Sequence, residues 1–120
     1  MGATHFTGPV ISDGAFQNSG TPTDYDGDDA IDPGVNVATL SKGSAASATL
    51  AAPGASNVGR FLLAVAASAQ AHVITITGLD STEDTLTFGG AIGDSVFLYA
   101  RSATVWTAVA YDGVTPTTAG

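Results

Sequence analysis

The stretch from residue 72 to residue 111 constrains the fold more than any other part of the chain. It contains four short runs rich in Val, Ile, Thr and aromatic residues, separated by Gly, Asp and Ser. This pattern is typical of consecutive antiparallel strands joined by turns. The sequence therefore predicts an all-β fold, a small antiparallel β-sandwich or barrel-like domain with an extended N-terminal arm.

Composition divides the chain into three parts. Residues 1–34 are rich in Gly, Pro, Ser, Thr and Asp, which indicates an extended arm with one short strand at residues 8–12. Residues 35–114 carry the β pattern, and residues 115–120 form a polar C-terminal tail. Strands are predicted at seven places: 35–40, 48–50, 60–66, 72–77, 85–88, 96–101 and 105–111.

The last two predicted strands form a hairpin that is apolar on both sides. With a loop at residues 102–104, one side pairs large with small residues: Ala100 with Trp106, Leu98 with Ala108, and Val96 with Ala110. The other side carries four further apolar or aromatic residues: Phe97, Tyr99, Val109 and Tyr111. Because the outer side of a half-exposed hairpin is normally polar, we expect a second sheet or another subunit to cover it.

Charge limits the partners of the chain. Three Lys and Arg stand against eleven Asp and Glu, which gives a formal net charge of −8. Nucleic-acid binding needs several cations that face phosphates, and Lys42, Arg60 and Arg101 are spread along the sequence. We therefore expect no direct binding to nucleic acid. A membrane is not expected either, because residues 61–76, the most apolar stretch, are too short and too polar to span one.

The acidic run at residues 24–32 has the spacing of a calcium loop. It supplies four candidate ligands at loop positions one, three, five and nine: Asp24, Asp26, Asp28 and Asp32. An EF-hand loop would have Gly where Asp29 stands and Glu where Val35 stands. The run also resembles the Asp-rich calcium loops of thrombospondin-type repeats, although it occurs once. A solvated acidic loop is the simpler interpretation beside the calcium site.

Residues with catalytic spacing are not recognisable in the sequence. His72 lies in a predicted strand without a nucleophile motif, and the neighbouring Glu83 and Asp84 fall in a predicted turn. Residues 54–60 have the glycine spacing of a phosphate loop but lack its Lys and its Ser or Thr. The sequence therefore predicts a protein that is not an enzyme, with no catalytic residues and no cofactor.

Both ends of the chain resemble one family. Residues 5–12, His-Phe-Thr-Gly-Pro-Val-Ile-Ser, followed by Gly14 and Phe16, resemble the N-terminus of small head proteins of tailed bacteriophages. Residues 93–98, Gly-Asp-Ser-Val-Phe-Leu, with a Trp-containing terminal strand after them, are similar to the same group. These are the capsid decoration proteins, also called cement or head-stabilising proteins. Residues 35–71 are compatible with the resemblance but do not add to it.

The resemblance implies a homotrimeric structural protein on the outer capsid surface of the virion, where it stabilises the phage head by bridging capsomers. Its partners would be copies of itself and the major capsid protein. Ten residues are the expected capsid or subunit contacts: His5, Phe6, Pro9, Val10, Ile11, Phe16, Phe97, Tyr99, Val109 and Tyr111. The alternative is a carbohydrate-binding or adhesive β-sandwich, with calcium at the acidic run and with Tyr25, Tyr99 or Trp106 as a platform for sugar.

Overall fold

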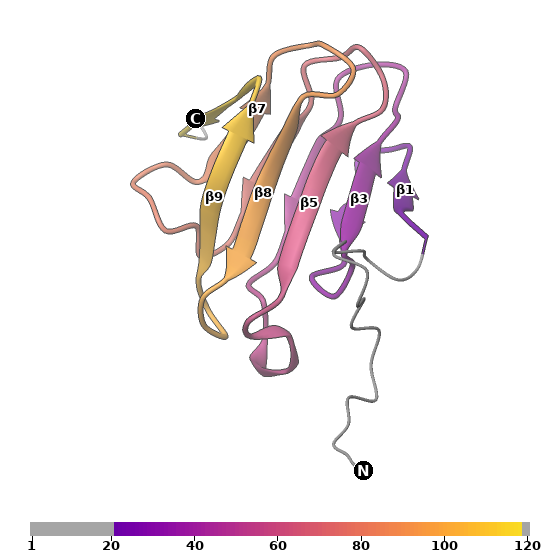
Figure 1. Cartoon of the computed structure of the whole chain (residues 1–120). Helices are drawn as coiled ribbons and strands as arrows, with labels where there is room; N and C mark the ends of the chain where they lie inside the picture. Colours follow the sequence, from indigo (N-terminus) through magenta and orange to yellow (C-terminus); the bar gives the residue numbers. More distant parts are fainter. Residues whose placement is uncertain (1–20, 119–120) are drawn as a thin grey trace, which may run out of the picture.

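The computed structural model describes residues 21–118, which form two five-stranded sheets packed as a sandwich (Figure 1). Sheet A has the strand order β1-β3-β5-β8-β9, and sheet B has the order β10-β7-β6-β4-β2. The strands are β1 Thr23–Tyr25, β2 Ala30–Ile31, β3 Val37–Leu40, β4 Ser47–Leu50, β5 Phe61–Ala66, β6 Val73–Ile76, β7 Thr85–Phe88, β8 Ser95–Ala100, β9 Trp106–Asp112 and β10 Val114–Thr117. The prediction of an all-β sandwich is confirmed.

The first six strands wind alternately through the two sheets. β1, β3 and β5 run parallel to one another in sheet A, and β2, β4 and β6 run parallel to one another in sheet B. The remaining pairs, which involve β7 to β10, are antiparallel. The sheets are therefore mixed, and the prediction of an antiparallel sandwich is wrong in this respect. Parallel neighbours need a crossover connection, and here each crossover passes through a strand of the opposite sheet.

The β structure extends beyond residues 35–114 on both sides. Within the expected arm, β1 pairs with β3 and β2 pairs with β4, and Ile31 of β2 is buried in the core. Within the expected tail, β10 pairs with β7 at the edge of sheet B. The strand expected at residues 8–12 lies outside the described residues.

The core lies between the sheets and follows the two-residue period of the strands. Leu62 of β5 and Leu98 of β8 face each other in sheet A, and both are buried. Trp106 is also fully buried, and its indole Nε1 donates a hydrogen bond to the backbone oxygen of Ala51 at 2.8 Å. Burying a side chain of the size of Leu contributes about 1.5–3 kcal/mol, so these residues are central to stability.

The β8–β9 hairpin has the predicted pairing only in the half next to its loop. Ala100 opposes Trp106 and Leu98 opposes Ala108, as the sequence predicts. A β-bulge then inserts Val109 as an additional residue in β9. The predicted pairing of Val96 with Ala110 is wrong for this reason.

Beyond the bulge, Phe97 opposes Ala110 and Val96 opposes Tyr111. Directly opposed residues of two strands share a side of the sheet. Because Val96 is buried in the core, Tyr111 lies on the side of sheet A that faces sheet B. Burial and the nearby charge of Glu83 both raise the pKa of the Tyr111 phenol. The structure therefore separates Tyr111 from the face on which the sequence placed it.

Candidate functional site

The outer face of sheet A, which is turned away from sheet B, is apolar. Strands β3, β5 and β8 place eight side chains on it, of which Thr39 and Ser95 are polar. The other six we call the aromatic face: Val37, Phe61, Leu63, Val65, Phe97 and Tyr99. The residues between them along β5 and β8 point into the core. Both sides of the two central strands are therefore apolar, which is unusual for a sheet with one face in water.

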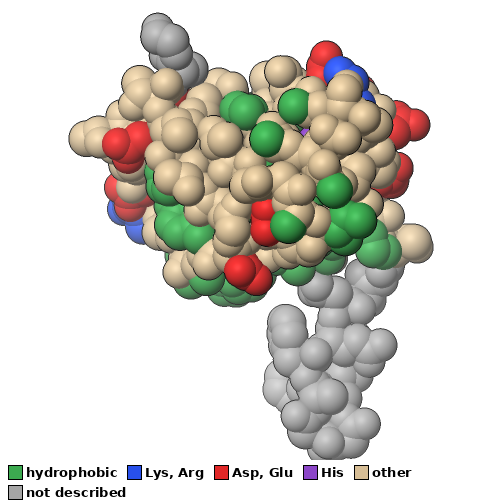
Figure 2. Space-filling model, turned by 90° about the horizontal axis from the view of Figure 1, so that it is seen from above, with side chains coloured by type: hydrophobic (Ala, Val, Ile, Leu, Met, Phe, Trp, Pro, Cys, Tyr) green, Lys and Arg blue, Asp and Glu red, His purple; other side chains and the backbone are tan. Residues whose placement is uncertain are grey.

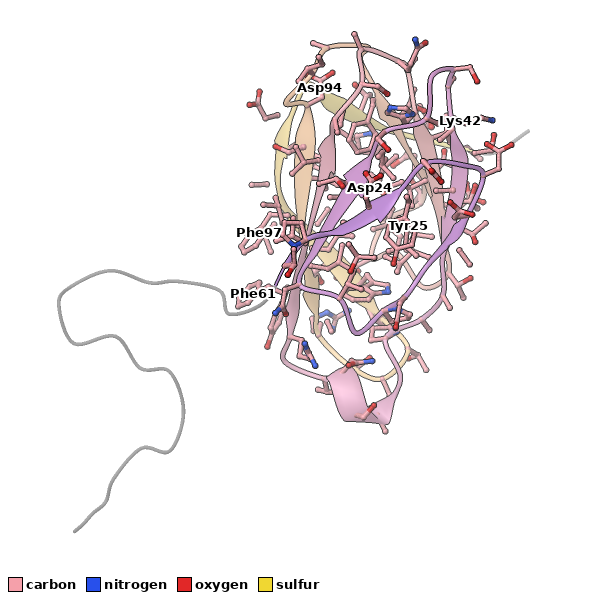
Figure 3. All side chains as sticks on the ribbon, turned by 90° about the vertical axis from the view of Figure 1, so that its right-hand side faces the viewer. Asp24, Tyr25, Lys42, Phe61, Asp94 and Phe97 are labelled. Atoms are coloured by element: carbon pink, nitrogen blue, oxygen red, sulfur yellow. The ribbon has the colours of Figure 1, made fainter. Side chains whose placement is uncertain are left out.

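Three aromatic rings of this face contact one another. The rings of Phe61 and Phe97 are stacked with centroids 4.9 Å apart and an interplanar angle of 3°. Tyr99 contacts Phe61 at 5.2 Å with a tilt of 38°. Phe61 is 46% exposed, and Figure 3 shows Phe61 and Phe97 pointing away from the sandwich on the same side. Because such contacts are worth about 0.5–1.5 kcal/mol, the rings help to hold one another in place within the single chain.

Two acidic groups lie on the same side of sheet A as the aromatic face, because Asp24 and Asp112 end the cross-strand row that contains Val65. Asp24 lies on β1 at one edge of sheet A, and Asp112 lies on β9 at the other. Ser41 and Thr39 donate hydrogen bonds to the Asp24 carboxylate, each at 2.7 Å, and lower its pKa. Arg60 precedes β5 and is hydrogen-bonded to the connection between β2 and β3. Seen from above, hydrophobic side chains gather along the lower margin, and acidic side chains lie at the left, at the right and also among the hydrophobic ones near the middle of that margin (Figure 2).

The structure brings together only part of the expected contact set. Phe97 and Tyr99 lie on the aromatic face, and Val109 is 55% exposed in the bulge of β9. Tyr111 is on the other side of the sheet. The remaining six lie outside the described residues: His5, Phe6, Pro9, Val10, Ile11 and Phe16.

Sequence reasoning missed four members of the aromatic face: Val37, Phe61, Leu63 and Val65. Three of them lie on β5, whose sequence Phe-Leu-Leu-Ala-Val-Ala is apolar at every position. A strand of this kind is apolar on both sides. That signal was available in the sequence, whereas the position of β5 beside Phe97 and Tyr99 comes from the pairing of β5 with β8.

The outer face of sheet B has a different chemistry. Its strands place nine residues on it in two cross-strand rows: Ala30, Thr49, Thr75, Thr85 and Thr117 in one, and Ser47, Val73, Thr87 and Thr115 in the other. The hydroxyl of Thr117 is hydrogen-bonded to the hydroxyls of Thr85 and Thr87. Thr85 is buried, whereas Thr49, Thr75 and Thr115 are exposed to solvent.

The four candidate calcium ligands do not converge in the structure. The carboxylate of Asp24 is bound by hydroxyls on and just after β3, as described above. Asp28 accepts hydrogen bonds from the Lys42 ammonium at 2.8 Å and from the Ser47 backbone N–H at 2.9 Å, which lower its pKa. Asp32 accepts a hydrogen bond within its own turn. Residues 21–118 contain no group of three or more His, Asp or Glu side chains placed to hold a metal ion.

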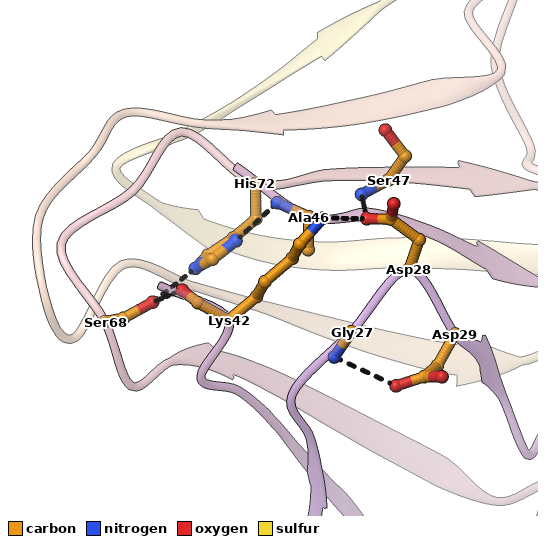
Figure 4. A network of polar contacts seen from close by, with 8 residues as sticks. All are labelled: Gly27, Asp28, Asp29, Lys42, Ala46, Ser47, Ser68 and His72. Atoms are coloured by element: carbon orange, nitrogen blue, oxygen red, sulfur yellow. Dashed lines mark hydrogen bonds and ion pairs between the residues drawn. The ribbon is translucent and has the colours of Figure 1, made fainter. Parts of the chain in front are cut away.

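His72 is buried, and its ring is hydrogen-bonded to Ala46 on one side and to Ser68 on the other (Figure 4). Its Nδ1 accepts a hydrogen bond from the Ala46 backbone N–H at 3.0 Å. Its Nε2 lies 3.0 Å from the Ser68 hydroxyl, which donates to the Lys42 backbone oxygen at 2.6 Å. This arrangement fits a neutral ring with its proton on Nε2, and burial lowers the pKa of His72.

The aromatic residues suggested for sugar binding are dispersed. Trp106 is fully buried, so it cannot form a platform. Tyr25 is half-buried, and its hydroxyl accepts a hydrogen bond from the Asp32 backbone N–H at 3.0 Å. Only Tyr99 lies on the outer side of the sandwich. The platform expected for the carbohydrate-binding alternative is therefore not assembled from these three residues.

Comparisons of the chain with models of known protein families, with curated proteins and with solved structures gave no match. Over residues 21–118 the structure contains no helix that is long and apolar enough to cross a membrane. The function is therefore argued from the aromatic face, the distribution of charge and the resemblance at the two ends of the sequence.

Proposed function

We propose that this protein is a non-catalytic capsid decoration protein of a tailed bacteriophage. It binds the outer surface of the capsid as a homotrimer and stabilises the head by bridging capsomers. The aromatic face is the observation that carries the proposal, because it is a preformed apolar surface on a chain with a net charge of −8. The resemblance of residues 5–16 and 93–98 to decoration proteins supports the choice of family.

The composition of the aromatic face is that of an interface core. Strands lie about 4.8 Å apart and rise about 3.3 Å per residue, so the face covers of the order of 300 Å². Protein interfaces have cores enriched in Phe and Tyr and depleted of charge. The six side chains of this face have that composition, with three aromatic residues and no charged ones.

The negative charge of the chain suits a position outside a DNA-filled shell. Phosphates inside the shell repel acidic groups, and a chain with three cations has no means to compete for them. Charge of one sign also keeps a protein soluble while it awaits assembly. The protein would bind assembled capsomers and not free ones. Such binding shifts the equilibrium between free and assembled capsomers toward the shell, and so stabilises it.

Purified phage heads that lack decoration provide the test. The wild-type protein should bind them saturably, in multiples of three copies, and should raise the temperature at which the heads break. Heads that already carry their decoration are the matched control and should bind none. Removal of residues 2–20 should abolish binding if the arm is the anchor. Failure of the wild-type protein to bind undecorated heads would overturn the proposal, and binding to a glycan would favour the carbohydrate-binding alternative.

A further inference from the structure

We infer that residues 5–16 of the arm cover the aromatic face of their own chain while the protein is free. These residues lie outside the described part of the chain, which begins at Thr21. The contact is intramolecular and belongs to the free protein, so it goes beyond the proposed function and does not depend on it. A capsid surface that binds the aromatic face takes the place of these residues.

The described chain begins beside the aromatic face. β1 is the edge strand of sheet A next to β3, and its Thr23 opposes Ala38 (Figure 1). Continued by one residue, this register brings Pro22 level with Val37, a member of the face. Because β1 runs parallel to β3 and β5, the chain enters β1 from the end of the sheet at which Phe61 lies. The arm is therefore attached next to the surface that it covers.

The length of the arm is sufficient to cross the face. Neighbouring strands lie about 4.8 Å apart, so β8 is roughly 14 Å from β1 across sheet A. An extended chain advances about 3.3 Å per residue, and about five residues therefore cover this distance. Phe16 stands five positions before Thr21. Its side chain can thus reach the rings on β5 and β8, and residues 5–12 extend further still.

Residues 5–16 have the composition that an apolar face requires. They contain Phe6, Phe16 and an apolar run at residues 9–11, Pro-Val-Ile. Asp13 is the one acid in residues 1–20, which hold no Lys or Arg. The whole chain has a net charge of −8, so a second copy would be repelled from this surface far more strongly. The arm offers apolar area with little of that repulsion.

The two acids on this side of sheet A lie away from the aromatic rings. Asp24 and Asp112 end the cross-strand row that contains Val65. Phe61 and Tyr99 pair four residues further along the strands, about 13 Å away. This separation exceeds the Debye length of about 8 Å at physiological salt. A segment that lies over the rings therefore avoids both carboxylates.

The small size of the aromatic face favours an occupant that is tethered to it. An area of the order of 300 Å² is well below the roughly 800 Å² that each partner contributes to a standard interface. A separate partner must also offset the loss of its translational and rotational freedom. A segment joined to the sheet by a short linker has an effective concentration of about a millimolar. A weak contact is then enough to keep the face covered.

The first experiment measures how fast a thiol on the aromatic face reacts with a maleimide. The chain has no Cys, so Leu63→Cys creates a single thiol there. Phe16→Asp and Gln17→Asp are compared in this background, because both add one negative charge to the arm and only the first removes an apolar side chain. Phe16→Asp should speed the reaction at least about tenfold, as for the loss of one buried Phe. Gln17→Asp should leave the rate unchanged.

Thr75→Cys places the control thiol on the outer face of sheet B. Its rate should be the same with and without Phe16→Asp. The protection of the thiol at residue 63 should also be independent of protein concentration, because the contact lies within one chain. Protection that grows with protein concentration would assign the face to a second copy and would overturn the inference.

A second experiment leaves the sandwich unchanged. In the wild-type chain, nuclear Overhauser cross-peaks are expected between the methyl groups of Ile11 and the rings of Phe97 or Tyr99. A mixture of labelled and unlabelled protein should show that these cross-peaks arise within one molecule. Phe16→Asp should weaken them, and Gln17→Asp should not.

Each outcome decides the inference. A Leu63→Cys thiol that reacts equally fast with and without Phe16→Asp overturns it, and so does equal acceleration by Phe16→Asp and Gln17→Asp. The absence of the cross-peaks from the wild-type chain also overturns it. Head binding is scored separately: a protein that binds undecorated heads but leaves its aromatic face uncovered when free defeats this inference and leaves the proposed function standing.

Discussion

The two sheets share one core but present opposite chemistry to the outside. On sheet A, six of the eight outward positions of β3, β5 and β8 are apolar or aromatic, and the other two are Thr39 and Ser95. On sheet B, seven of the nine outward positions in the two rows are Thr or Ser. Both faces follow the same two-residue alternation, so the difference does not come from the fold.

This difference shows which surface is suited to contact. Thr is a good strand former, and water solvates its hydroxyl. The outer face of sheet B can therefore remain in contact with water. The outer side of sheet A contributes little to the stability of a single copy and exposes apolar area to water. Its residues therefore make sense in an assembly, and the comparison can be tested strand by strand.

The largest effect on stability is expected along β5, whose residues point alternately into the core and to the outer face of sheet A. Leu62 is 1% exposed and its neighbour Leu63 is half-buried on the aromatic face. Leu62→Ala should reduce the free energy of unfolding by about 2–5 kcal/mol, because it leaves a cavity. Leu63→Ala should cost about 1 kcal/mol or less in dilute, monomeric protein. Urea unfolding measures both values, and equal losses would contradict the assignment of the two sides.

A smaller effect is expected at His72, which belongs to the sheet B side of the core. His72→Leu removes the acceptor of the Ala46 N–H and should cost about 1–3 kcal/mol near pH 7.5. Chemical unfolding measures this loss. Ser68→Ala is a useful control, because it removes the hydroxyl next to Nε2 and leaves the Ala46 hydrogen bond in place.

His72 also makes the free energy of unfolding depend on pH. The pKa of His72 is lowered in the folded protein and is about 6.5 in the unfolded chain. Above pH 7 the His72 ring is neutral in both the folded and the unfolded state, so it does not make the free energy of unfolding change with pH. As pH falls below about 6.5, the unfolded state takes up a proton first and stability falls. Unfolding curves at pH 7.5 and pH 5 should differ for the wild type and differ less for His72→Leu. An unchanged slope in the variant would rule out this source.

A still smaller effect is expected on the outer face of sheet B. Thr75 is exposed in the centre of the sheet, between Thr49 and Thr85. Thr75→Val should change the free energy of unfolding by no more than about 0.5 kcal/mol. Light scattering should also show an unchanged association. A new tendency to associate would mean that the hydroxyl row keeps this face free of partners.

The smallest effect is expected from calcium. Asp24 and Asp28 already accept hydrogen bonds from groups of the protein itself. A ligand that binds only the folded state raises the unfolding midpoint, so thermal unfolding with calcium and with a chelator is a direct measurement. We expect the two midpoints to coincide, and a clear rise with calcium would restore the metal site.

The sequence predicted most of the strands because their local patterns are strong. It missed β1 and β2, since strands of three and two residues are too short to show alternation and lie in an acidic, Gly-rich run. It also missed β10, where Pro116 argues against a strand. Proline is tolerated there because β10 lies at the edge of sheet B.

The candidate site was predicted in part for similar reasons. Phe97 and Tyr99 were found because the hairpin pairing next to the loop is set by local sequence. Tyr111 was placed on the wrong side of sheet A because Val109 is an additional residue in β9. After such a bulge, each following residue of the strand points to the opposite side of the sheet. The contribution of β3 and β5 depends on pairing between distant segments, parallel between β3 and β5 and antiparallel between β5 and β8, and no local pattern encodes that pairing.

The winding of the first six strands places β1 and β2 together at one side of the sandwich, where each is the last strand of its sheet. Another molecule could in principle add further strands there. The two edges are only three and two residues long. They also lie in the run that carries Asp24, Asp26 and Asp28. Charge on a short edge strand opposes such pairing, so we expect the acidic run to limit polymerisation at this side without a metal.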